Sequence, residues 1–162
     1  MKLLGNSGYK LLKSIHIFLS STWIGAGVCI LFLLTVVLNK DNIYGVLLSV
    51  HFIVLFIVIP SEILTFITGI LFSKYTNWGF FKHRWIIFKY LINLIPLIFG
   101  GILFAPQILN MIKIAKETGA NAFSSHSFLL SKSIFIMLLV FQLILLMIAI
   151  YLSVFKPKLG QK

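Results

Sequence analysis

Long apolar runs separated by short polar or basic segments are the dominant pattern of this chain. Each run exceeds the roughly 20 residues that an α-helix needs to cross a hydrocarbon core about 30 Å thick. The chain has 162 residues, and the three intervening segments are too short to hold a second domain, so we expect one transmembrane domain over 1–162. The four predicted membrane helices cover about residues 9–38, 43–73, 85–112 and 128–155.

These helices predict an all-α integral membrane fold. In lipid only helices and closed barrels satisfy their backbone hydrogen bonds, and the runs are far longer than barrel strands. The short connection at residues 39–42 favours an antiparallel pair, so the simplest architecture is an antiparallel up-down bundle of four transmembrane helices. We expect the longest connection, residues 113–127, to be the most exposed part. Pro60 and Pro96 should kink the second and third helices.

Composition agrees with a membrane location. The chain is 60% hydrophobic and 10% charged, with a mean hydropathy of +1.08. Its formal net charge of +11 would suggest a nucleic-acid ligand in a soluble protein. Here the basic residues lie mainly at the ends and in the connections, which is typical of topology signals and of contact with anionic lipid. We therefore expect the lipid bilayer as a partner and no nucleic acid.

The distribution of basic residues predicts the orientation. The two ends and the second connection carry nine, whereas the first and third connections carry four when Lys132, just after the third, is included, so both termini should be cytoplasmic. Tyr75, Trp78 and Trp85 suit the headgroup interface of that side. The nine are Lys2, Lys10, Lys13, Lys74, Lys82, Arg84, Lys156, Lys158 and Lys162, and the four are Lys40, Lys113, Lys116 and Lys132.

The single cysteine, Cys29, lies inside the first apolar run. One cysteine excludes an intrachain disulfide and a thiolate metal cluster, so we expect it to pack in the helix. The first run is longer than the roughly 7–15 apolar residues of a signal peptide, and no A-x-A site follows it. It is therefore interpreted as a membrane helix.

Polar and small residues form one stripe on each predicted helix when the sequence is projected at about 100° per residue. Without a hydrophobic force between helices in lipid, such stripes should face the bundle interior. The stripes are His16, Ser20, Trp23 and Gly27; His51, Glu62, Thr65 and Gly69; Lys89, Asn93, Pro96, Gly100 and Gln107; and Ser131, Gln142, Ala149 and Ser153.

The depth of these residues follows from their distance along each helix. His16 and Lys89 should lie roughly 3–6 Å into the core on the cytoplasmic side. His51 should lie towards the opposite surface, so the two histidines are too far apart to hold one ligand. The deeper polar core comprises Trp23, Thr65 and Asn93 at about 12–14 Å, and Glu62 and Gln142 at about 17–18 Å.

Glu62 is the most distinctive of these residues, because a carboxyl group near the bilayer midplane costs about 2.5–3.5 kcal/mol on insertion scales. It is a candidate proton-relay group, cation ligand or cofactor partner. The structural alternative is a protonated side chain hydrogen-bonded to Gln142 or Asn93. Either role would place Glu62 inside the bundle.

His16 and Lys89 also have two interpretations each. The neutral imidazole of His16 is a candidate metal ligand, or it bonds a neighbouring serine or carbonyl. Lys89 is a candidate partner for a ligand carboxylate, or its ammonium extends to the nearby interface. With three acidic residues in all, a two-carboxylate active site or a carboxylate-rich divalent-metal site is implausible.

Three motifs in chain order resemble a known family. They are Lys13-x-x-His16 with Trp23 ten residues after the lysine, Pro60 followed by Leu64-Thr65 and Gly69, and Trp85-x-x-x-Lys89. This pattern resembles the bacterial membrane-bound protoporphyrinogen oxidases of the HemJ type and the related copper-resistance protein D-like membrane domains. The resemblance covers about the first three helices and implies a bacterial cell-membrane protein of that superfamily, in an uncharacterised branch.

The resemblance further implies a haem b or porphyrin site, with His16 as axial ligand, Lys89 near a propionate or substrate, and Trp23 behind them. The chain departs from the family at two places. Cys29-Ile30-Leu31-Phe32 replaces a Pro-Arg segment, and Ile87 stands where the family has a histidine. We therefore assign no catalytic residue and no enzymatic activity.

Two other functions remain open. A small transporter-like protein would use Glu62 as an intramembrane titrating group, with Pro60 and Pro96 providing flexible helices. A non-catalytic membrane subunit would serve partner binding. Gly25, Gly27 and the pair at residues 100–101 would permit close helix contacts, within a protomer or in a homo-oligomer or membrane complex.

Overall fold

The computed structural model describes residues 4–76, 79–81 and 83–156. Over these ranges it is helical and contains no strand, which confirms the all-α prediction for the described part of the chain. Four helical segments are long and apolar enough to cross a membrane, as predicted. They are Asn6–Val37, Ile43–Tyr75, Arg84–Ser124 and His126–Phe155.

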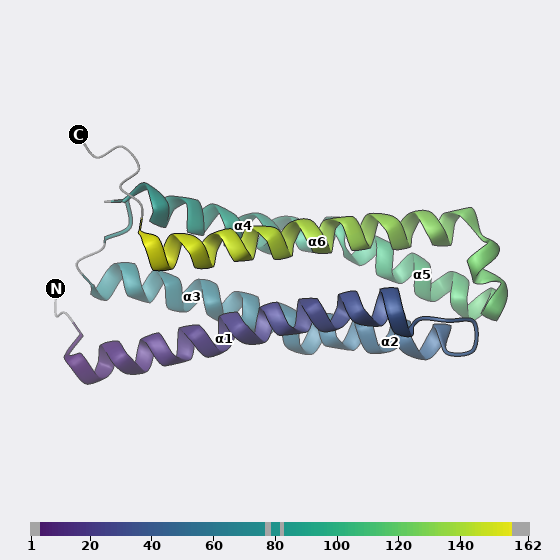
Figure 1. Ribbon diagram of the computed structural model, residues 1–162, viewed down its shortest axis with the longest axis horizontal. Coiled ribbons are helices and arrows are strands. Elements are labelled where there is room, and N and C mark those ends of the chain that lie inside the picture. The colour runs from purple at the N-terminus through teal and green to yellow at the C-terminus, as the bar shows by residue number, and fades with distance from the viewer. Residues whose placement is uncertain (1–3, 77–78, 82, 157–162) are drawn as a thin grey trace.

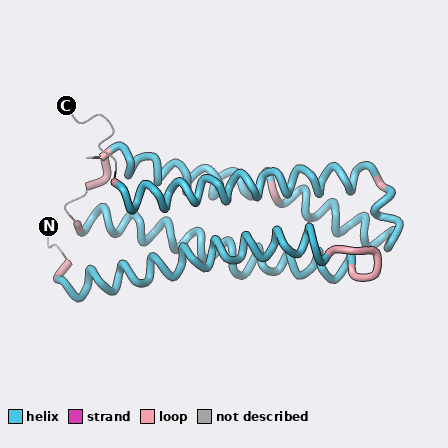
Figure 2. The backbone as a smooth tube through the Cα atoms, viewed as in Figure 1, coloured by secondary structure: helices cyan, strands magenta, loops and turns pink. Residues whose placement is uncertain are grey.

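The four segments lie side by side along the length of the molecule (Figures 1 and 2). The chain reverses its direction from each segment to the next. The start of the first segment and the end of the last lie at the same end of the molecule. The elements in order are α1 (Asn6–Phe32), η1 (Leu33–Val37), α2 (Ile43–Ile53), η2 (Val54–Val58), α3 (Ile59–Tyr75), α4 (Arg84–Leu103), α5 (Ala105–Thr118), η3 (Gly119–Ser124) and α6 (His126–Phe155).

The third segment differs from the prediction. Residues 113–127 were expected to form an exposed connection, yet α5 continues through Thr118 and a 3-10 helix, η3, follows it. The helix is instead interrupted inside the predicted run, at Phe104 between α4 and α5 (Figure 2). Pro106 explains the position of the break, because a proline has no N–H to donate four residues back and is favoured in a first turn.

Pro60 and Pro96 leave their helices continuous. Pro96 lies inside α4, which extends seven residues beyond it. Pro60 lies in the first turn of α3, directly after the π-helical turn η2, where the N–H of Ile59 donates to the carbonyl of Val54 five residues back. A wider turn of this kind changes the hydrogen-bond register of a helix, and such turns are frequent near functional sites.

The two halves of the bundle have different interiors. The half that contains the 39–42 connection, here called the apolar half, has a continuous hydrophobic core from α1, α2, α5 and α6. Leu34, Leu47, Phe128 and Phe135 are almost completely buried there. The other half, here called the terminal half, contains the beginnings of α1 and α4 and the ends of α3 and α6 (Figure 1).

The outward surface of the described chain is apolar. Phe18, Phe56 and Ile102 each expose about two thirds or more of their side chains. Soluble monomers rarely expose extended apolar surface of this kind. Cys29 belongs to this outer surface, so the packing role expected for it is not found against other described residues.

The expected interface residues behave differently from one another. Tyr75 ends α3 and is partly exposed, but Trp85 is 5% exposed and packs with Ile86 and Leu152 inside the terminal half. Trp85 therefore is not an exposed interface residue. Trp78, Lys2, Lys82, Lys158 and Lys162 lie outside the described residues.

Candidate functional site

The interior of the terminal half is lined by the polar face of α3. Five of the six buried residues of α3 have polar side chains, while Ile63, Leu64 and Ile67 of the same helix face outward. In an ordinary globular helix the apolar side would be inside. This inverted helix is the basis of the candidate site. Its buried polar residues are Ser61, Glu62, Thr65, Thr68 and Ser73.

His16 of α1 contacts this face. Its Nδ1 lies 2.7 Å from the hydroxyl oxygen of Thr68, and its ring meets the edge of Phe72 with centroids 5.5 Å apart. The Thr68 hydroxyl also lies 2.9 Å from the carbonyl oxygens of Leu64 and Thr65, which only accept hydrogen bonds. The hydroxyl proton therefore goes to a carbonyl, and Thr68 accepts from the Nδ1–H of His16. This arrangement leaves Nε2 with its lone pair.

Lys89 joins α4 to α6 in the same half. Its ammonium donates to the hydroxyl of Ser153 over 2.7 Å and lies 5.6 Å from the centre of the Trp85 ring. The pairing of Lys89 with a ligand carboxylate and its extension to the interface both stay predictions; the structure adds this hydrogen bond between α4 and α6. The charge of Lys156 is within electrostatic range of the Lys89 ammonium, so this region favours anions.

Tyr90 of α4 contacts two residues of α3. Its hydroxyl donates to that of Ser73, and its ring packs edge-on against Phe66 with centroids 6.2 Å apart. One turn further along α4, the amide nitrogen of Asn93 donates to the carbonyl oxygen of Lys89 over 2.7 Å. The amide oxygen of Asn93 is buried and has no hydrogen-bond partner in the described chain.

Glu62 is 6% exposed, and its Oε1 is buried without a hydrogen-bond partner among the described residues. The expected hydrogen bonds to Gln142 or Asn93 do not occur there, so that structural explanation of Glu62 is wrong. Thr65, one turn along the same face, also has a hydroxyl oxygen without a partner. Burying a carboxyl or hydroxyl group without a hydrogen-bond partner costs free energy. This part of the bundle is therefore a candidate ligand site.

The remaining predicted residues occupy separate positions. Trp23 is 2% exposed in α1, and Gln142 is half-buried in α6. His51 has a buried, unpartnered Nδ1 and lies in α2, 17 residues before Thr68 on one continuous helical segment. At about 1.5 Å per residue, His51 and the His16–Thr68 pair are roughly 25 Å apart.

Sequence reasoning missed several polar residues. Thr68 is three residues after Thr65 and therefore on the same helix face, so the periodicity contained a signal for it. Asn110 had no such signal, because it lies in the amphipathic α5. Its amide donates to the hydroxyls of Ser127 and Ser131 over 3.0 and 2.8 Å, which joins α5 to α6 in the apolar half.

Metal-ligand side chains do not cluster at the site. Within the described ranges, no three His, Cys, Asp or Glu side chains gather as metal ligands, so His16 is a single candidate ligand.

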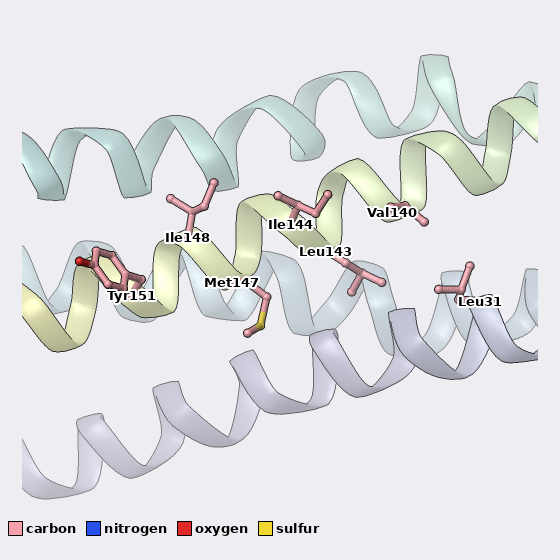
Figure 3. Close-up of a pocket in the computed structure, with 7 residues that line it drawn as sticks. All are labelled: Leu31, Val140, Leu143, Ile144, Met147, Ile148 and Tyr151. Atoms are coloured by element: carbon pink, nitrogen blue, oxygen red, sulfur yellow. The ribbon is translucent and has the colours of Figure 1, made fainter.

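A groove of about 420 Å³ lies between α1 and α6 (Figure 3). Its lining is apolar except for the hydroxyl of Tyr151 and includes none of the predicted site residues. The lining residues are Leu31, Val140, Leu143, Ile144, Met147, Ile148 and Tyr151.

The Lys89–Ser153 pair generates a stability prediction. We expect Ser153→Ala to reduce the free energy of unfolding by about 1–3 kcal/mol, because it leaves a partly buried ammonium without its acceptor. We expect Lys89→Met to reduce it by less, because that change removes the charge together with its desolvation cost. Thermal and denaturant unfolding of the detergent-solubilised protein would measure both. A larger loss for Lys89→Met would contradict this account of the pair.

Comparison with known proteins leaves the site to be interpreted from its own geometry. No protein-family model matches the chain. No curated protein and no solved structure is significantly similar to it.

Proposed function

We propose that the chain is a multi-pass membrane protein that holds haem b or another porphyrin beside His16 in its terminal half. The observation that supports this function best is the fixed tautomer of His16. Histidines that ligate metals commonly donate their other ring N–H to a neighbouring group, which orients the ring and increases its basicity. The Thr68 hydroxyl does this for Nδ1, and Nε2 keeps the lone pair that a ligand to iron requires.

The surrounding residues suit the other parts of such a group. Lys89 has a hydroxyl and an aromatic ring as its partners, with further positive charge nearby, so its ammonium would bind a propionate. Trp23 and Phe72 would provide apolar and aromatic surface next to His16. When bound, haem would supply one-electron chemistry at its iron. The residues of this chain would orient it and exclude water from it.

The proposed setting is the cell membrane, with the four apolar segments arranged as an antiparallel up-down transmembrane bundle. The inverted polarity of α3 and the apolar outer surface support insertion in lipid. The described basic residues near the two ends, such as Lys10, Lys13 and Lys156, support a cytoplasmic location of the terminal half. The site beside His16 would then lie on the cytoplasmic side.

Cysteine accessibility tests this orientation. In a Cys29→Ser background, we expect a membrane-impermeant maleimide to label Glu117→Cys in intact cells. We expect Ser7→Cys to be labelled only after the cells are permeabilised, because Ser7 is exposed at the opposite end of the bundle. The reverse labelling pattern would place the termini outside the cytoplasm.

The absorption spectrum of the purified protein tests haem binding. Protein expressed in haem-supplemented cells should show a Soret band that His16→Ala abolishes, because the substitution removes the only proposed protein ligand. Thr68→Val should shift or weaken the band, because it removes the acceptor that orients the imidazole; second-sphere changes of this kind typically reduce metal affinity about 10–100-fold.

His51→Ala is the matched control for this experiment. It removes another half-buried histidine, roughly 25 Å away, and should leave the spectrum unchanged. A purified wild-type protein without a Soret band would refute the haem proposal. So would a band that persists in His16→Ala.

A second candidate function is supported by a different residue. Glu62 has a buried, unpartnered carboxyl oxygen on the polar face of α3, and its side chain forms no ion pair with a described residue. Ionisable groups inside membrane bundles commonly mark proton or ion pathways. In this interpretation the protein is transporter-like, and Glu62 takes up and releases a proton.

Proton flux in proteoliposomes tests the second candidate. Under an imposed pH gradient, we expect wild-type protein to conduct protons and Glu62→Gln to reduce the flux to that of empty vesicles, because a carboxamide cannot release a proton. Glu117→Gln is the matched control, since Glu117 is exposed in α5. Equal flux in wild type and Glu62→Gln would exclude Glu62 as the proton-carrying group.

A further inference from the structure

Three oxygen atoms inside the terminal half have no hydrogen-bond partner in the described chain: Glu62 Oε1, Thr65 Oγ1 and Asn93 Oδ1. The side chains of Glu62 and Thr65 are 6% and 5% exposed. Buried polar atoms in native proteins are almost always hydrogen-bonded, so three unpartnered oxygens in one region require an explanation. A bound ligand that interacts with oxygen is the simplest one.

The behaviour of Thr65 is unusual for its position. Hydroxyl side chains in helices ordinarily donate to a carbonyl three or four residues back. On the same face, Ser61 donates to Ile57 and Val58 and Thr68 donates to Leu64 and Thr65. Thr65 makes no such bond, so its oxygen is not occupied by the backbone of its own helix.

The register of α3 and α4 indicates that the three residues lie at neighbouring levels of the bundle. Glu62 and Thr65 are one turn apart on the buried face of α3. Tyr90 of α4 contacts Phe66 and Ser73 of α3, which sets the register of the two helices. The two helices run in opposite directions (Figure 1). A residue three positions after Tyr90, such as Asn93, should therefore lie at a level nearer to Thr65 than to Ser73. The bond from its amide nitrogen to Lys89 leaves its oxygen available.

The chemistry of these oxygens indicates the charge of the ligand. A carboxylate, a hydroxyl and an amide carbonyl are the oxygen donors that hard metal cations prefer. The site has a single carboxylate, so a monovalent cation would be neutralised there, whereas a divalent cation would leave a net charge in a low-dielectric interior. The Lys89 ammonium does not pair with Glu62, because it bonds the Ser153 hydroxyl, and the neutral ring of His16 bonds Thr68.

We propose that Glu62, Thr65 and Asn93 form a binding site for sodium ion in the terminal half of the bundle. The site deepens the second candidate function, with which it shares the premise that Glu62 is ionised in a functional state. The two proposals are tested by different measurements. The sodium site is tested by equilibrium binding, whereas the transporter-like function is tested by proton flux. The sodium site also does not require haem, because neither His16 nor Lys89 contributes a ligand.

Equilibrium binding of radiolabelled sodium to detergent-purified protein tests this proposal. Wild-type protein should bind sodium saturably, with competition by unlabelled sodium and weaker competition by choline. Glu62→Gln and Thr65→Val should each weaken binding at least about tenfold, which corresponds to about 1.4 kcal/mol. Glu117→Gln and Thr35→Val are the matched controls, because both residues are exposed and the Thr35 hydroxyl is bonded to the Leu31 carbonyl.

Size-exclusion chromatography and thermal unfolding would verify that each variant is folded. Retention of wild-type affinity in folded Glu62→Gln or Thr65→Val would overturn the site. Absence of saturable sodium binding by the wild type would overturn the site as well. If Glu62→Gln still abolished proton flux in that case, the second candidate function would stand without the sodium site. Sodium binding with unchanged flux in Glu62→Gln would leave the site and remove the transporter-like function.

Discussion

The inverted polarity of α3 is the constraint on which the rest of the structure depends. Its buried face is formed by serine, threonine and glutamate with one phenylalanine, and its outer face by isoleucine and leucine. In water such a helix would expose its apolar side at a large free-energy cost. In hydrocarbon the same arrangement is favourable, because polar groups then have no partners except those on neighbouring helices. The bonds from His16 to Thr68 and from Lys89 to Ser153 are consequences of that requirement.

The division into an apolar and a terminal half follows from how each half is held together. The apolar half depends on close packing of side chains such as Leu34, Leu47 and Phe135, which are almost fully buried. At Gly27, an added Cβ would lie 3.0 Å from the Leu143 side chain, so α1 and α6 approach closely there. The terminal half depends on hydrogen bonds between helices, which contribute only about 0.6 kcal/mol each on average in membranes.

Hydropathy was sufficient to predict the number and approximate limits of the apolar segments, because lipid solubility is a property of composition. It failed at residues 113–118, where Lys113, Lys116 and Glu117 make the sequence polar but do not stop an amphipathic helix. Periodicity identified the buried face of α3 through Glu62 and Thr65. It could not identify Thr68 as the partner of His16, nor the absence of a partner for Glu62, because a helical projection gives the face of a residue and not its contacts.

The two proposed ligand positions complement each other electrostatically. Lys89, with Lys156 nearby, makes the region next to His16 favourable for anions, whereas Glu62 lies six residues deeper along α3 than Thr68. Six helical residues span about 9 Å, and two unit charges at that distance interact by about 2 kcal/mol at an effective dielectric constant near 20. An anionic group bound at the level of Thr68 would therefore strengthen the binding of a cation or proton at Glu62, and the reverse would hold equally. If both proposed ligands bind, the single carboxylate of the site and the lysine would form a charge-balanced pair, in which the occupancy of each position would influence that of the other.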